Sequence, residues 1–350
     1  MSNILNSVAL PPKSLITPET LRNRVYFSKH LTAYQCWLEL ETALKRQGVQ
    51  YELLPNTTDI WARDYMPVQC ATNRYVAYTY NPDYLRNQPQ YITNWQSVMP
   101  QHRLPIFDSH LVLDGGNIIV CEGKVILTDK IFVENATLSR SEVLHRLQEA
   151  FRAEPIIIPW DKEEPYGHAD GMVRYIGNNR VLLTNYINFD PHLREQLLQV
   201  LQPHFEVLEL YYDVAKPHKN SWAYINYLLV DGRLFMPRLN AEEDEQACTQ
   251  LGAALNISRE HIELIDIHTV LKAGGGLNCV SWTIYANHSP LLHDEFTSAM
   301  HDEFSIDEET EIKHKAMCVW KLLGTNYTPD QLQKYCDIYA ITIDQAKRWK

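Results

Sequence analysis

Short apolar runs recur in pairs along the chain, each pair separated by a tight turn, and this pattern is typical of β-hairpins. Four hairpins are predicted, at 66–80, 117–129, 172–186 and 224–237. The last one turns at Asp231-Gly232, which is a strong signal for a two-residue hairpin. A further apolar run at 277–285 could begin a final hairpin.

The segments between the hairpins show the apolar spacing of helices. The segment 139–153 opens with Ser139 and Glu142 at the spacing of a capping box, and a short apolar strand follows it. Helices are also predicted over 19–48, 191–204 and 241–255, and each of them is followed by a short apolar strand. The repeating unit is therefore helix, strand, hairpin.

The spacing of the units supports a repeat. The landmarks Asp64, Asp114, His168, Trp222 and Cys279 open successive hairpins and are 50, 54, 54 and 57 residues apart. A nearly fixed period of this size is typical of repeat architectures. Five α/β units suggest a closed ring with pseudo-fivefold repeats, because closure removes exposed sheet edges. Equivalent positions would then face one axis, which is the predicted active site.

The composition narrows the classes of molecule that the protein is expected to bind. The 32 Lys+Arg and 43 Asp+Glu give a net charge of −11, which argues against nucleic acid and is compatible with a small cationic substrate. The sequence contains no apolar stretch of about 18 residues, so no membrane span is predicted. The N-terminus does not resemble a signal peptide, so a cytoplasmic protein is expected. The seven cysteines include no CxxC pair, which fits reduced thiols. A homo-oligomer is compatible with the sequence.

Two motifs carry candidate acids and bases. His168 and Asp170 are two residues apart, so on a strand both would project from one face into one pocket. A surface-facing polar pair explains the same spacing. In the other motif Trp61, Arg63 and Asp64 stand together at a strand start. Arg63 is expected to be structural, and Asp64 is the better functional candidate because of its place in the repeat.

Glycines accompany the other two landmarks. Asp114 precedes Gly115-Gly116, which permits close backbone approach, although a tight turn capped by Asp114 explains it equally well. Three glycines at 274–276 precede Cys279. Neither GxxxxGK[ST] nor GxGxxG occurs there, so nucleotide binding is not indicated. The run either lets a cysteine approach a ligand or forms a flexible turn before a core cysteine.

Five segments together resemble the agmatine deiminases and the related bacterial-type peptidylarginine deiminases. These families belong to the guanidine-modifying pentein superfamily, whose fold is a five-bladed α/β-propeller. The resemblance implies a catalytic domain over 15–290. Residues 291–350 lie outside the five-unit pattern and are expected to form a helical C-terminal extension. Thr328 as N-cap and Pro329 at the first helical position predict a helix over 328–339, and a second helix is predicted over 342–350. The matching segments are 61–68, 114–120, 167–176, 221–229 and 274–279.

The resemblance also implies roles for single residues. Cys279 resembles the nucleophile and His168 the general acid/base, while Asp64 and Asp170 resemble the carboxylates that grip the guanidinium. Asp114 stands where these enzymes often place a glutamate that hydrogen-bonds the histidine. The shorter side chain departs from the family pattern, as does the Gly-Leu-Asn-Cys segment before Val-Ser-Trp.

The chemistry suits these residue types. Carboxylates bind a planar guanidinium through bidentate hydrogen bonds, and a thiolate can attack its carbon. The implied reaction is hydrolysis of agmatine to N-carbamoylputrescine and ammonia through a covalent thiouronium, a step of polyamine biosynthesis, with no metal or organic cofactor. The alternatives are a deiminase of free or peptidyl arginine, an amidinotransferase on the same fold, and a non-catalytic regulatory protein.

The amine end of agmatine would need an aromatic or anionic lining. Trp61, Tyr166 and Trp282 are the aromatic candidates, and Glu163 and Glu164 are the acidic ones. Core aromatics and surface acids explain each of them as well. Free arginine would instead need a cation for its carboxylate, and the candidates are Lys216, Lys219 and Lys272.

Overall fold

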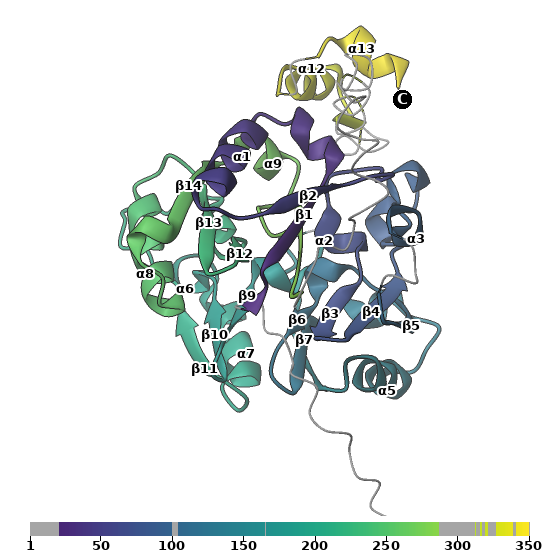
Figure 1. Cartoon of the computed structure of the whole chain (residues 1–350), viewed down its shortest axis with the longest axis vertical. Coiled ribbons are helices and arrows are strands. Elements are labelled where there is room, and N and C mark those ends of the chain that lie inside the picture. Colours follow the sequence, from purple (N-terminus) through teal and green to yellow (C-terminus); the bar gives the residue numbers. More distant parts are fainter. Residues whose placement is uncertain are drawn as a thin grey trace, which may run out of the picture.

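The computed structural model describes residues 21–99, 104–164, 166–286, 312, 316, 319–320, 327–338 and 341–349. Within these residues the strands form five three-stranded sheets. Helices α1, α3, α5, α7 and α8 lie at the periphery of the sheets (Figure 1). The alternation of helix and hairpin read from the sequence therefore matches the α/β order of the structure.

All five sheets share one topology, in which an antiparallel pair of strands is extended by a third, parallel strand. The four predicted hairpins are confirmed, and each third strand follows its helices along the chain. The four sheets are β3 (Val68–Ala71), β4 (Arg74–Thr79) and β5 (Ile106–Val112); β6 (Ile119–Val120), β7 (Lys124–Thr128) and β8 (Glu154–Ile158); β9 (Val173–Gly177), β10 (Arg180–Leu183) and β11 (Glu206–Glu209); and β12 (Leu228–Val230), β13 (Arg233–Arg238) and β14 (Ile262–Asp266).

The fifth sheet joins the two ends of the repeat. Strand β15 (Ser281–Ile284) pairs antiparallel with β1 (Arg24–Ser28), which pairs parallel with β2 (Tyr51–Leu54). The run at 277–285 thus pairs with a strand from the start of the chain. The predicted helix over 19–48 is wrong at 24–28 and correct only at α1 (Cys36–Arg46). Val25 and its aromatic neighbours are fully buried, and such side chains favour a strand between two partners.

The outer helices bury apolar faces between neighbouring sheets. Helix α5 (Arg140–Phe151) begins at Ser139, whose hydroxyl accepts a hydrogen bond from the Glu142 N–H at 3.2 Å. Its buried positions, including Val143 and Leu147, recur at helical spacing and join one core cluster. The remaining outer helices are α3 (Trp95–Val98), α4 (Lys130–Glu134), α6 (Tyr186–Phe189), α7 (Pro191–Leu201), α8 (Glu243–Leu255) and α9 (His268–Lys272).

Two helices of the predicted C-terminal extension are present. They are α12 (Pro329–Ile338) and α13 (Ile343–Arg348), and they lie beyond the end of the sheets near α1 (Figure 1). Trp320 joins the same core cluster as residues of α1, and its carbonyl accepts a hydrogen bond from Gln88 at 3.2 Å. Much of 291–350 lies outside the described residues. In the part of the chain that is described, no helix has the length and apolar character needed to cross a membrane.

Candidate active site

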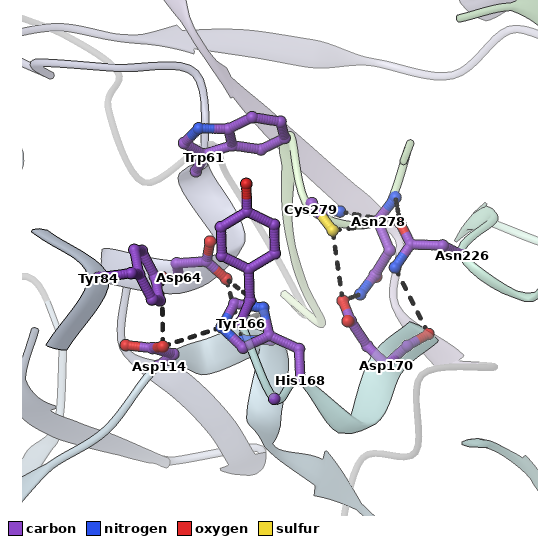
Figure 2. A network of polar contacts seen from close by, with 12 residues as sticks. Trp61, Asp64, Tyr84, Asp114, Tyr166, His168, Asp170, Asn226, Asn278 and Cys279 are labelled. Atoms are coloured by element: carbon purple, nitrogen blue, oxygen red, sulfur yellow. Dashed lines mark hydrogen bonds and ion pairs between the residues drawn. The ribbon is translucent and has the colours of Figure 1, made fainter. Parts of the chain in front are cut away.

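The candidate site is built from equivalent turns of the five sheets. A short helical turn or a tight turn precedes the first strand of each hairpin: α2 (Ala62–Tyr65), the 3-10 turns η6 (Gly115–Asn117), η7 (Ala169–Gly171) and η8 (Ser221–Ile225), and a turn at 277–280. These turns carry or adjoin Asp64, Asp114, His168, Asn226 and Cys279. Figure 2 shows these side chains in two neighbouring groups of polar contacts, one around His168 and one around Cys279. Residues that are far apart in sequence therefore come together because they occupy the same place in the repeat.

A small cavity opens among these side chains. Its volume is about 20 Å³, enough for roughly one water molecule. His168, Asp64 and Cys279 face it together. The lining residues are Trp61, Asp64, Tyr84, Tyr166, His168, Ala273, Gly274 and Cys279.

The His168 ring lies between two carboxylates. Its Nε2 is 2.8 Å from Asp114 Oδ2, and its Nδ1 is 3.8 Å from Asp64 Oδ1. Asp114 Oδ2 also accepts a hydrogen bond from the Tyr84 hydroxyl at 3.2 Å. A Cβ at Gly116 would lie 2.6 Å from His168 Nδ1, so only glycine leaves space for this ring. The shorter Asp114 thus reaches the histidine that the family glutamate was expected to hold.

The Cys279 sulfur is on the other side of the cavity, beside Asp170 and Asn226. Cys279 Sγ is 3.3 Å from Asn226 Oδ1 and 3.8 Å from Asp170 Oδ2. The Asn226 amide oxygen also accepts a hydrogen bond from the Cys279 backbone N–H at 3.3 Å. Asn278 Nδ2 donates to Asp170 Oδ2 at 2.6 Å, which holds this carboxylate next to the sulfur.

Arg63 is hydrogen-bonded to the segment that carries Asn278 and Cys279. Its guanidinium donates to Asn278 Oδ1 at 2.8 Å and to Thr283 Oγ1 at 3.2 Å, and its backbone N–H donates to the Cys279 carbonyl at 3.1 Å. The side chain is buried. The structure thus agrees with the structural role predicted for Arg63.

Burial and charge set the protonation of the site. Burial alone would lower the pKa of His168, but the charges of Asp64 and Asp114, the hydrogen bond to Asp114 and the charge of Glu164 together raise it to about 10. Burial raises the pKa of the Cys279 thiol well above its ordinary value, and the charges of Asp170 and Asp64 add to this effect. At neutral pH the site therefore holds an imidazolium and a neutral thiol.

These residues are the set that guanidinium chemistry needs, and comparison with known proteins agrees. A family model described as Porphyromonas-type peptidyl-arginine deiminase matches residues 30–284, which is most of the chain. The chain belongs to this family. No curated protein matches the sequence.

Solved structures place this family member in the pentein fold. The C. jejuni agmatine deiminase is 17% identical, with a TM-score of 0.60, and the match covers 78% of this chain and 96% of that one. The agmatine deiminase of Enterococcus faecalis is 15% identical, with a TM-score of 0.61 and the same two coverages. At such identities the likeness establishes the fold alone.

The structure of this peptidyl-arginine deiminase family member brings most of the predicted site residues together. Trp61 and Tyr166 line the cavity with Asp64, His168 and Cys279, while Asp114 and Asp170 contact His168 and Cys279 from outside it. Asp170 lies in the turn η7 and His168 directly precedes it, and the predicted strand begins only at Val173. The reasoning from alternate strand positions was therefore wrong at this point.

Three other predicted candidates lie elsewhere. Trp282 is 1% exposed, and its indole Nε1 donates to the Pro67 carbonyl at 2.8 Å within the core. Its packing between aromatic residues of that core argues against contact with a substrate. Glu163 is exposed. Glu164 accepts hydrogen bonds from the backbone of Tyr166, Gly167 and His168, so it orders the loop that carries His168.

Asn226, Tyr84, Asn278 and Lys130 are site residues that the sequence analysis missed. Asn226 could have been found from the repeat, since it is 56 residues after Asp170 and 53 before Cys279. The landmark chosen for that unit, Trp222, lies a few residues too early. No periodic signal marks Tyr84, which lies in the short 3-10 turn η3 (Asp83–Leu85) between β4 and β5. Among the described residues no cluster of His, Cys, Asp and Glu has the arrangement of a metal site.

Proposed function

We propose that this chain is a cysteine-dependent guanidine deiminase that hydrolyses agmatine to N-carbamoylputrescine and ammonia. One observation carries the proposal: Cys279, His168 and Asp64 face a single cavity, and Asp170 lies 3.8 Å from the sulfur. Membership of a deiminase family supports the reaction class.

Binding of the guanidinium is the first step. Asp64 and Asp170 would accept its N–H groups in charge-assisted hydrogen bonds. The incoming positive charge would offset the two acids that raise the pKa of the Cys279 thiol, so the thiol would release its proton to solvent only when substrate is present.

The covalent steps then follow from the charges in the site. The Cys279 thiolate attacks the central carbon, and the His168 imidazolium gives its proton to the departing nitrogen, which leaves as ammonia. The neutral His168 next takes a proton from water, which attacks the thiouronium carbon. The C–S bond of this adduct then breaks and the sulfur takes the hydroxyl proton, which yields the neutral ureido product and restores the Cys279 thiol beside the His168 imidazolium.

The cavity lining favours agmatine over free arginine. The described residues that line it include no Lys or Arg to hold a substrate carboxylate. Trp61, Tyr84 and Tyr166 instead offer aromatic faces, which attract an ammonium group. Lys216, Lys219 and Lys272 are exposed and are not among the lining residues. Peptidyl arginine, named in the family description, is the second candidate because its carboxylate is blocked in the peptide.

We propose further that the five sheets are blades of a closed propeller over 15–290 and that 291–350 is a helical appendage packed on it. The pairing of β1 with β15 supports closure. The cysteines of the described residues carry free thiols, which supports a reducing, cytoplasmic location.

Turnover by the intact protein tests the proposal. Agmatine, free arginine and an arginine peptide would each be supplied, and the ureido product and ammonia would be measured. Cys279→Ala should abolish turnover, whereas Cys70→Ala, at a buried cysteine in β3, should retain it. Normal turnover by Cys279→Ala would remove the mechanism, and no turnover of any guanidine by the wild type would remove the class. Product that forms only with an added amine would indicate an amidinotransferase.

A further inference from the structure

The mouth of the cavity is formed by the lining residues that are partly exposed. Among the described residues that line the cavity these are Tyr84, Tyr166 and Gly274, whereas the others, which include His168 and Cys279, are buried. A substrate therefore passes the mouth before it reaches the reacting groups. Two residues of the mouth carry an aromatic ring, and the third lies in the loop that leads to Cys279.

Tyr166 contacts both of the other residues of the mouth. Its ring meets the Tyr84 ring edge-on, with 5.0 Å between the centroids. A Cβ at Gly274 would lie 2.8 Å from Cε2 and 2.9 Å from Cζ of the Tyr166 ring, so only glycine leaves space for the ring there. Figure 2 shows the ring in front of the His168 imidazole, and the two ring centroids are 6.0 Å apart. The Tyr166 ring therefore spans the mouth, from Tyr84 to the loop before Cys279.

Hydrogen bonds fix the backbone of Tyr166 in this place. Its N–H donates to Glu164 Oε1 at 2.9 Å, and its carbonyl accepts a hydrogen bond from Lys130 Nζ at 2.6 Å. The Lys130 side chain is 1% exposed, so this partner belongs to the protein interior. With its backbone held, the ring can leave the mouth only through a change of its own side-chain torsions.

The two substrates considered for this site differ in what they place at the mouth. The carbon chain of agmatine is unbranched and ends in an ammonium, which the face of an aromatic ring attracts. In peptidyl arginine the chain ends at an α-carbon that carries peptide groups on both sides. These groups would compete with the Tyr166 ring for the same space, and a clash of this kind is a common source of specificity.

We infer that Tyr166 is a specificity-determining residue, whose ring admits unbranched guanidines to the cavity and excludes arginine within a polypeptide. The inference rests on the proposed function for its kinetic consequence, because it concerns the choice among substrates of that reaction. Its structural content is a mouth that one ring closes to bulky groups, and this can be tested without turnover.

The kinetic test compares the wild type, Tyr166→Ala and Tyr166→Phe with agmatine and with N-acetyl-arginine amide. In Tyr166→Ala the kcat/KM for the blocked arginine should rise, and its ratio to the kcat/KM for agmatine should rise at least about tenfold. Phenylalanine keeps the ring, so the ratio should stay within about threefold of the wild-type value. Tyr211→Ala, at an exposed tyrosine outside the lining, is the matched control and should leave the ratio unchanged.

The second test measures access to the Cys279 sulfur. Iodoacetamide and a fluorescein-labelled iodoacetamide differ in bulk but alkylate the same thiol, so the thiol pKa cancels from the ratio of their rates. Peptide mass spectrometry separates modification of Cys279 from that of other cysteines. In Tyr166→Ala the rate for the bulky reagent relative to the small one should rise at least about tenfold, and in Tyr211→Ala it should not change.

Three results would overturn the inference. One is a wild type that turns over the blocked arginine as efficiently as agmatine. Another is a Tyr166→Ala variant in which either ratio stays at the wild-type value, and the third is a Tyr166→Phe variant that behaves like Tyr166→Ala. If the wild type turns over no guanidine, the proposed function fails and the alkylation ratio alone decides the inference. If Tyr166→Ala shows no melting transition, Tyr166→Leu takes its place in both assays.

Discussion

Replacement of Asp170 by asparagine should change the thiol and the enzyme in opposite directions. Before substrate binds, the Asp170 charge helps to keep the Cys279 thiol protonated. In the proposed complex the same charge binds the guanidinium. Asp170→Asn should therefore make the free thiol more acidic and the enzyme less active. Asparagine still offers an oxygen to Asn278 Nδ2, so the local hydrogen bond can persist.

The size of both effects follows from the geometry. A charge 3.8 Å from Cys279 Sγ contributes about 4 kcal/mol at an effective dielectric constant of about 20, an upper limit of about three pKa units. Screening by the Asn278 amide and by water reduces this, so a fall of about one to three units in the thiol pKa is expected. Loss of one charge-assisted hydrogen bond to substrate should lower kcat/KM about tenfold to hundredfold.

Two assays on the same preparations measure these effects. The rate of alkylation at Cys279 by a small reagent, followed by peptide mass spectrometry across pH, gives the thiol pKa. Release of the ureido product from agmatine gives kcat/KM. Asp190→Asn, at the cap of α7, is the matched control and should change neither value. An unchanged or higher thiol pKa in Asp170→Asn would refute the electrostatic reasoning, as would undiminished turnover.

Three further outcomes are expected. Asp114→Asn should lower the pKa of His168 from about 10, and because the imidazolium is lost as pH rises through this pKa, the alkaline limb of the kcat profile should move down by about one unit or more. Asn226→Ala leaves the buried Cys279 N–H without its acceptor side chain, so chemical denaturation should show a loss of about 1–3 kcal/mol in stability, together with a lower kcat. Leu147→Ala, in the core beneath α5, should cost about 2–5 kcal/mol in the same unfolding assay and leave KM for agmatine unchanged.

The hairpins and outer helices could be predicted because their signals are local. Turn residues such as Asp231-Gly232 and the cap at Ser139 specify conformation within a few residues. Strand β1 could not be predicted in this way. Its sequence carries apolar residues without a nearby turn signal, and its partners β15 and β2 are supplied by distant parts of the chain. Tertiary pairing overrides the helical pattern there.

The candidate site was predictable as far as the repeat is regular. Asp64, Asp114 and Cys279 occupy equivalent turns, so a search at one period finds them. Lys130 and Tyr84 were missed because they lie after the middle strand of their units, whereas the search compared only the turns before the first strand. Trp282 was wrongly favoured because closeness to Cys279 in sequence does not decide on which side of a strand an indole lies. It points into the core behind β15.

The charge balance of the site links recognition to reactivity. The charges of Asp170 and Asp64 lie beside the Cys279 thiol and raise its pKa. They suppress the thiolate, because a further anion beside Asp170 would be costly. A cationic substrate removes the penalty at the moment it arrives. An uncharged analogue of similar shape would lack this effect even where it fits, so discrimination against neutral amides would arise in thiol activation and appear in kcat as well as in binding. Between turnovers the same carboxylates would keep Cys279 as a neutral, weakly nucleophilic thiol. This would protect its sulfur from electrophiles and oxidants.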